Sequence, residues 1–297
     1  MDLIESRLDD IDAYVAYFSA RPLPVLKHTV RELEQLRSEE DSVSARRLAG
    51  VVLGDPLMAM RVITFLEERR RRSQNHDITT IDRAIMMMGV SPFFQAFSDL
   101  PVVEDQLARH PRALLGLLKV INRARRAAHF ARDWAIVRHD LDVEEITLGA
   151  LLREAAEILC WSFAPELALQ VQAAQRNDRN LRTALAQESV FGCSADDIQQ
   201  RLIHTWRLPE LLLNLIDESH ADNPRVRNIA LAGALARHSE RGWDDPALPD
   251  DFEAVCRLLH IGIESLLKRL GVPQEYAIRY LPDPDGSESA AMPTGNP

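Results

Sequence analysis

The sequence Gly149-Ala-Leu-Leu-Arg-Glu-Ala-Ala-Glu157 is apolar except for its charged residues. Together with Leu148 and Leu159, its apolar side chains recur at intervals of three and four residues, the period of an amphipathic helix. Asp142 is the predicted N-cap of this helix. The pair Arg153-Glu154 lies within it, and an arginine cannot ligate a divalent cation because its guanidinium stays protonated and has no acceptor. We therefore predict one continuous helix with no metal ligand at Arg153.

The same period recurs along most of the chain. Near the N-terminus it predicts a helix from Ile4 to Phe18 that ends at Arg21-Pro22. A later apolar stripe carries small side chains that allow a neighbouring helix to approach: Val120, Ala124, Ala127, Ala131 and Trp134. Further helices are predicted near residues 225–240, 250–260 and 263–270. With only 12 glycines and 6% aromatic residues, the chain is predicted to be all-α.

Capping residues predict where several helices begin. Ser42 is expected to cap the helix that precedes Gly54. Thr79 with Asp82 has the spacing of a capping box. Ser194 has the same relation to an acidic residue three positions later, Asp197, so a helix is expected to start there as well.

Composition restricts the classes of partner. The net charge of -10 disfavours general binding to phosphate backbones or anionic membranes. The three cysteines are far apart and odd in number, which argues against a disulfide framework or a zinc knuckle. No apolar run approaches the roughly 18 residues that span a bilayer. We expect a cytoplasmic protein that binds neither nucleic acid nor membranes and uses no cofactor.

The predicted helices fall into two lobes. Five or six short helices precede a junction between about Leu100 and Pro111. We predict an N-terminal helical lobe over residues 1–105 and a second helical lobe over residues 106–281. Residues 282–297 are rich in Pro, Gly and Ser, a composition typical of a disordered tail.

The order of several short motifs resembles the HDOD family of bacterial signalling proteins, relatives of HD and HD-GYP phosphohydrolases that usually lack the catalytic metal ligands. In the first half of the chain the matching residues are Leu23-Pro24, Asp55-Pro56-Leu57, and Ile78-Thr-Thr-Ile81 with Gly89. In the second half they are Gly149-Ala-Leu151-Leu152, Glu188, Phe191-Gly192 and Trp206-Arg-Leu208-Pro209.

The resemblance implies an N-terminal bundle of five or six helices packed on a degenerate HD-type helical lobe. Where the family often retains His-Asp after the paired leucines, this chain has Arg153-Glu154. The paired histidines that follow the Trp-x-Leu-Pro segment are reduced to Ser219-His220. By this carry-over no catalytic residue and no metal ligand remains.

Other candidates for chemistry have simpler interpretations. The dipeptides His76-Asp77 and His139-Asp140 are predicted to lie in loops or caps, because neither context brings further ligands together. Glu154 and Glu157, three apart, are expected on a solvated or ion-paired helix face. The run Met86-Met-Met88 is expected to fill the core, although a pliable binding surface is the alternative.

These observations lead to one functional prediction and one alternative. The predicted function is a non-catalytic signal-transduction module that binds a protein partner and a small regulatory ligand. Its groove is expected near Arg153, Glu154, Trp206 and His220, and Arg123 and Arg126 are candidates for binding the partner or a nucleotide phosphate. The alternative is a divergent metal-dependent phosphohydrolase that acts on a nucleotide or cyclic dinucleotide. The partner, the signal and the oligomeric state stay open.

Overall fold

A computed structural model describes residues 2–69, 80–178, 181–208, 210–216, 220 and 222–281. Over these residues the chain forms helices and no strand, so the prediction of an all-α fold is confirmed. The only extended pairing among them is an isolated parallel bridge between Val25 and Val102. The chain divides into two compact units, Met1–Arg237 and His238–Pro297.

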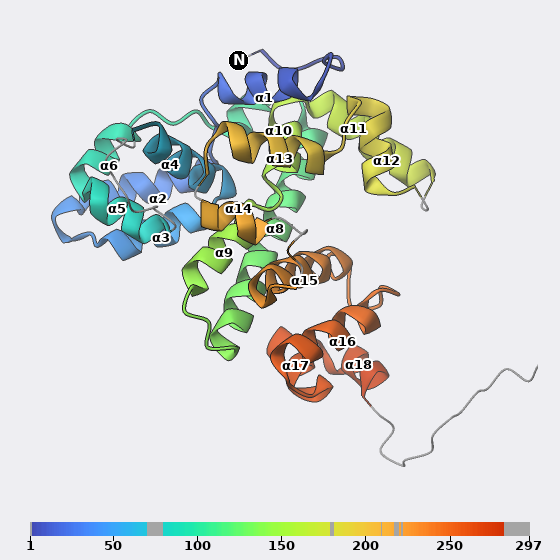
Figure 1. Cartoon of the computed structure of the whole chain (residues 1–297). Helices are drawn as coiled ribbons and strands as arrows, with labels where there is room; N and C mark the ends of the chain where they lie inside the picture. The colour runs from blue at the N-terminus through green and yellow to red at the C-terminus, as the bar shows by residue number, and fades with distance from the viewer. Residues whose placement is uncertain are drawn as a thin grey trace, which may run out of the picture. The chain divides into compact units, whose positions relative to one another are not determined.

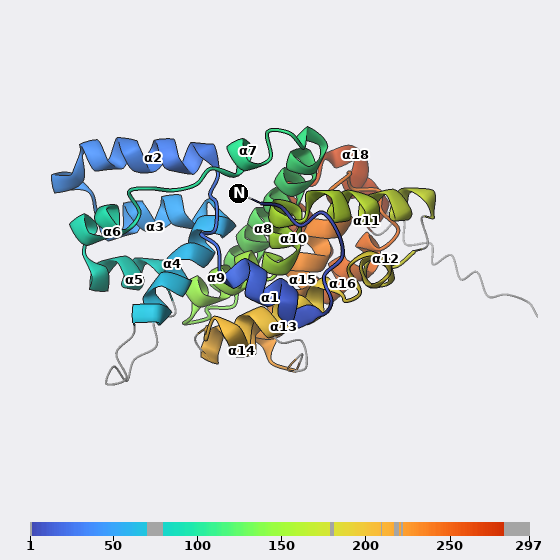
Figure 2. The same cartoon turned by 90° about the horizontal axis from the view of Figure 1, so that it is seen from above.

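The first helix, α1 (Ile11–Ser19), lies against α13 (Ala195–Thr205) in both views of the molecule (Figures 1 and 2). Its N-cap Asp10 accepts a hydrogen bond from the Ala13 amide. The predicted helix start at Ile4 was therefore wrong. Ile4 is buried in the preceding segment, where its amide donates to the carbonyl of Phe163 at 2.7 Å.

A group of short helices follows on one side of the unit (Figure 2). Their bounds are α2 (Lys27–Ser38), α3 (Ala45–Leu53), α4 (Pro56–Arg69), α5 (Ile81–Met88) and α6 (Val90–Ala96), with a 3-10 turn at Glu40–Ser42. Asp55 joins the starts of α2 and α4 and is fully buried. Its carboxylate accepts hydrogen bonds from the Leu26 amide (2.8 Å), the Thr29 hydroxyl (2.9 Å) and the Leu57 amide (2.9 Å). The Asp-Pro-Leu motif therefore has a structural role, because its aspartate connects the first turns of α2 and α4.

Two predicted caps were displaced along the chain. The N-cap of α3 is Ser44, whose hydroxyl accepts from the Arg47 amide, and Ser42 lies in the 3-10 turn instead. The N-cap of α5 is Thr80, whereas Thr79 lies outside the described residues. In both cases the helix begins later, because a neighbouring hydroxyl reaches the free amide of its first turn.

The exposure of α5 corrects the prediction that its methionines fill the core. Met86 is 61% exposed and Met87 is 53% exposed. The apolar face of α5 is instead formed by Ile81, Ala84 and Ile85, which are buried at helical spacing.

The short helix α7 (Val103–Gln106) leads into α8 (Pro111–Val137), a helix of 27 residues. The predicted small-residue stripe of α8 is buried along its whole length, from Val120 to Trp134. At Gly116 an added Cβ would lie 2.5 Å from the Trp161 ring, so the helix that carries this tryptophan packs directly on the α8 backbone. Arg125 of α8 donates to the carbonyl of Gly54 and thereby joins α8 to the start of α4.

The remaining helices of the first unit follow α8 along the chain. They are α9 (Val143–Leu152), α10 (Ala155–Phe163), α11 (Pro165–Asn177), α12 (Thr183–Phe191), α13, α14 (Glu210–Ile216) and α15 (Pro224–His238). Of these, α9, α10 and α11 pack on α8. The capping box predicted at Ser194 and Asp197 is confirmed at the start of α13. Pro224 is the first residue of α15, a position where proline is favoured because the first amide of a helix needs no partner within it.

The second unit contains α16 (Leu248–Leu259), α17 (Ile263–Leu270), α18 (Gln274–Ala277) and a 3-10 turn at Ile278–Tyr280. The Tyr280 hydroxyl donates to the Trp243 carbonyl at 2.6 Å, and its ring packs edge-on against Phe252. The helices predicted near 225–240, 250–260 and 263–270 are confirmed as α15, α16 and α17.

The boundaries predicted at residues 105 and 281 stay predictions. The segment 97–110 does connect the α2–α6 group to α8, but both sides of it belong to the same compact unit. The predicted tail, residues 282–297, lies outside the described residues. Within those that are described, no helix combines the length and the apolar character needed to cross a membrane.

Candidate functional site

The predicted continuous helix is broken at Arg153-Glu154, which corrects the sequence interpretation. One helix, α9, ends at Leu152 and the next, α10, starts at Ala155. The buried side chain of Gln199 on α13 spans the break, accepting from the Ala156 amide at 2.8 Å and donating to the Leu152 carbonyl at 3.1 Å. Helix ends leave such backbone groups without partners, so Gln199 stabilises the break.

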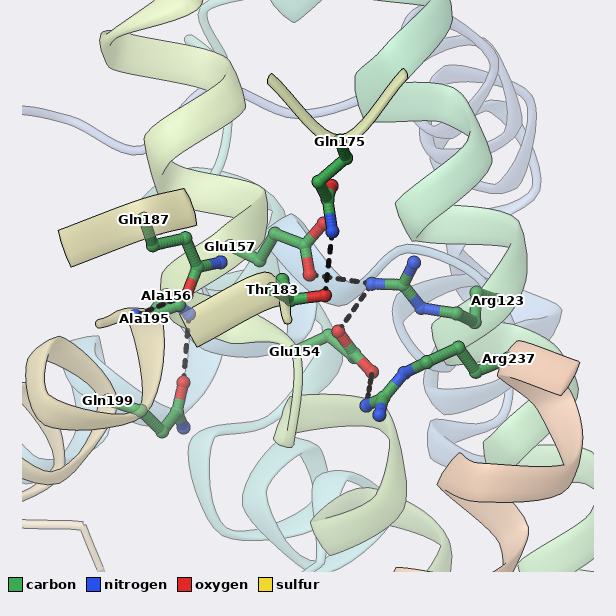
Figure 3. A network of polar contacts seen from close by, with 10 residues as sticks. All are labelled: Arg123, Glu154, Ala156, Glu157, Gln175, Thr183, Gln187, Ala195, Gln199 and Arg237. Atoms are coloured by element: carbon green, nitrogen blue, oxygen red, sulfur yellow. Dashed lines mark hydrogen bonds and ion pairs between the residues drawn. The ribbon is translucent and has the colours of Figure 1, made fainter. Parts of the chain in front are cut away.

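Glu154 lies in a buried ionic cluster with arginines from two other helices (Figure 3). Arg123 of α8 donates to both Glu154 and Glu157 at 2.6 Å. The side chains of Arg123 and Glu154 are 11% and 7% exposed, and that of Glu157 is 24% exposed. Arg237 of α15 lies 3.6 Å from the second oxygen of Glu154. The expected ion-paired face is therefore largely buried.

The pKa values of the two carboxyl groups in this cluster are shifted in opposite directions. Burial by itself raises the pKa of Glu154, but the charge and hydrogen bond of Arg123, followed by the charge of Arg237, outweigh it and lower that pKa to about 2. Burial raises the pKa of Glu157, and the neighbouring Glu154 charge adds to that effect. Glu154 is thus the member of the pair that is ionised at neutral pH.

The stem of Arg153 lies against Gly233 of α15. An added Cβ at Gly233 would lie 3.2 Å from its Nε atom and 3.4 Å from its Cδ atom. The absence of a side chain at Gly233 therefore makes room for the stem of Arg153.

Trp206 contributes to a small apolar hollow beside the helix break. The hollow is lined by residues of α4, α9, α10 and α13, among them Met60, Leu152 and Gln199. The indole of Trp206 donates to the Ser19 hydroxyl at 2.9 Å, so the end of α1 borders the hollow. The space that the centre of a water molecule can reach is about 10 Å³, room for about one water. The hollow as it stands does not hold a nucleotide.

The structure brings together some of the predicted site residues. Arg123 and Glu154 are in contact, and Leu152 and Ala155, on either side of Arg153-Glu154, line the hollow with Trp206. Arg126 lies over the Phe130 ring, with 5.7 Å from its guanidinium carbon to the ring centroid. His220 is exposed in the segment before α15, where its carbonyl accepts from the Asn223 amide at 2.8 Å.

Two contributors were not identified from the sequence. Gln199 stands beside the apolar residue Ile198 on α13, and a polar residue next to a core stripe is the one signal that singles it out. Arg237 ends a small-residue helix and carries no signal of its partner, Glu154.

Of the two His-Asp dipeptides predicted to lie in loops or caps, only His139-Asp140 lies among the described residues. Asp140 pairs with Arg138 at 3.2 Å in the turn after α8, where His139 has a positive φ of 55°, so the loop interpretation is confirmed there. His76-Asp77 lies outside the described residues. The described part of the chain contains no group of three His, Cys, Asp or Glu side chains placed to hold a metal ion.

The model of the HDOD domain matches residues 23–222. No curated protein matches the chain. Among solved structures, a virulence factor from Campylobacter jejuni subsp. jejuni is similar with a TM-score of 0.65 and 20% identity, covering 91% of this chain and 99% of its own. The MmoQ response regulator from Methylococcus capsulatus has a TM-score of 0.61 and 18% identity, covering 85% and 99%. At these identities the likeness establishes the fold.

Proposed function

Because the chain belongs to the HDOD domain family, we propose that it is a non-catalytic signalling module that binds a protein partner and responds to a small regulatory ligand. The observation that carries the proposal is the ionic cluster. At the position where the resemblance implies His-Asp in catalytic relatives, Glu154 is held by Arg123, and Arg153 offers no acceptor to a cation. A carboxylate that already forms two ion pairs would have to give them up to bind a metal ion, which disfavours a metal site here.

The proposed docking surface is the one around Trp206. Its indole is partly exposed and lies beside an apolar hollow, and partly exposed aromatic side chains are the residues that most often anchor protein interfaces. The partner would place one small apolar group against Met60 and Trp206. The end of α1 at Ser19 forms the edge of this surface.

The test separates binding from catalysis. Protein purified without chelator is incubated with Mn²⁺ or Zn²⁺, desalted and examined by elemental analysis and by hydrolysis of bis(p-nitrophenyl) phosphate. We expect substoichiometric metal and no hydrolysis. Stoichiometric metal together with turnover that requires it would replace the proposal by the metal-dependent phosphohydrolase.

Partner binding is tested with a matched pair of variants. Trp206→Ala removes the aromatic surface, whereas Ser19→Ala removes the hydrogen bond and keeps the indole. Proteins captured by the wild type from the source cells should be retained by Ser19→Ala and lost by Trp206→Ala. Equal capture by both variants would place the docking surface elsewhere.

A further inference from the structure

Two buried polar atoms, one on α8 and one on α15, have no hydrogen-bond partner among the described residues. They are Nε1 of Trp134 on α8 and Oδ1 of Asn228 on α15, and both side chains have a relative exposure of 0%. An N–H group and a carbonyl that are removed from water without a partner each cost free energy, so most such atoms in folded proteins are satisfied by protein or by ordered water.

Asn228 meets α8 one turn before Trp134. The amide nitrogen of Asn228 donates to the Ala131 carbonyl at 3.0 Å, and Ala131 precedes Trp134 by three residues, so both lie on the same face of α8. The Trp134 ring is stacked on Phe130, with 6.0 Å between centroids and 6° between planes. It therefore leans back along α8 toward the turn that meets Asn228.

The chemistry of the two atoms is complementary. An indole nitrogen can only donate, and Oδ1 of an asparagine can only accept. Exchanging the amide oxygen and nitrogen of Asn228 would set two oxygens against each other at Ala131, so the orientation of the amide is determined by that contact. A molecule that satisfies both atoms must accept one hydrogen bond and donate another in a small space, which is what a single water does.

We propose that Trp134 and Asn228 form an internal hydration site in which one ordered water accepts from the indole and donates to the amide oxygen. The site joins the first half of α15 to α8. The same helix carries Gly233, which accommodates Arg153, and Arg237, which pairs with Glu154. The water thereby helps to position the helix that completes the ionic cluster. This inference is independent of the proposed function.

The site is tested by water-selective NMR on the full-length protein labelled with ¹⁵N at its four tryptophans. Single Phe replacements of Trp161, Trp206 and Trp243 assign three indole signals, and the fourth is Trp134. We expect a cross-peak between the Trp134 indole proton and water whose nuclear Overhauser effect has opposite signs in the laboratory and rotating frames, which distinguishes a bound water from proton exchange.

Two variants make the test specific. Asn228→Leu removes the acceptor and should abolish the cross-peak at Trp134. Asn214→Leu, an exposed amide on α14, should retain it. Absence of the cross-peak in the wild type, or its persistence in Asn228→Leu, would overturn the proposal. Where Asn228→Leu does not fold, Asn228→Met, which also fills the space and offers no amide oxygen, serves in its place, and the wild-type spectrum still decides.

Discussion

At the scale of single residues, Glu154 dominates the chemistry of the candidate site. Its carboxylate is 7% exposed and is ionised because Arg123 and Arg237 lie on either side of it. An isolated buried carboxylate would take up a proton instead. The charge of Arg123 thus has a structural use here: it allows an acidic side chain to remain buried at the break between two helices.

Glu154→Gln should lower the free energy of unfolding at pH 7 by about 3 kcal/mol, because one partner of a buried ion pair is removed. The loss is not larger because Arg123 keeps Glu157 as a second partner. The pKa of Glu154 is lowered from 4.5 to about 2 in the folded state, so its contribution is present above pH 4.5 and is lost as the pH falls from 4.5 to about 2. Urea unfolding between these values should show a flatter pH dependence in the variant.

Glu157→Gln is the control for this prediction. The pKa of Glu157 is raised by burial, so its contribution has the opposite sign: it is present below pH 4.5 and declines as the pH rises through the raised value. The loss of stability toward pH 2 should therefore remain in Glu157→Gln. Equal slopes in the wild type and in Glu154→Gln would contradict the assignment.

Restoring the dipeptide of the catalytic relatives should not restore a metal site. We expect Arg153→His combined with Glu154→Asp to bind no stoichiometric Mn²⁺ or Zn²⁺ in elemental analysis, because the described residues provide no set of three ligands around it. The shorter Asp side chain would also weaken the contact with Arg123, so a lower melting temperature is expected. Tight metal binding by the double variant would show that further ligands converge there.

At the scale of helices, two glycines that both lie within a helix differ in how closely other residues pack against them. Gly116 on α8 lies under the Trp161 ring, whereas Gly50 on α3 has no atom within 4 Å of the place where a Cβ would be. Both lie inside helices, and both positions would gain helix propensity on replacement by alanine. The surroundings in the tertiary structure therefore determine the sign of the effect.

Gly116→Ala should destabilise the protein by about 1–3 kcal/mol, because the new methyl group would lie 2.5 Å from the Trp161 ring and the neighbours must shift. Gly50→Ala should stabilise it by about 0.5–1 kcal/mol. The midpoints of urea unfolding measure both changes. A neutral result at Gly116 would mean that Trp161 can move aside without cost.

At the scale of the whole molecule, the first compact unit is expected to unfold in a single cooperative transition. The α2–α6 group and the helices around α8 belong to one compact unit, and Arg125 connects them through the Gly54 carbonyl. All four tryptophans lie beyond residue 130, outside α2–α6. Tryptophan fluorescence thus reports on the rest of the chain, while far-UV circular dichroism reports on all helices.

Asp55→Ala should lower the unfolding midpoint in both signals together. Three donors lose a buried acceptor, at a cost of roughly 3 kcal/mol or more, and a cooperative unit transmits this loss to the tryptophans. An early transition in circular dichroism with unchanged fluorescence would instead support an independent lobe over residues 1–105. Asp41→Ala, at an exposed position of the 3-10 turn, is the control and should leave both midpoints near the wild type.

The sequence by itself determined the all-α class, most helix positions and the motifs of the family, because helical period and capping chemistry depend on residues that are close along the chain. It did not determine the break at Arg153-Glu154, the exposure of Met86 and Met87, or the partners of Glu154. Arg123 and Glu154 are 31 positions apart. Which distant side chains meet is decided by the packing of α8, α10, α13 and α15, and no local pattern records it.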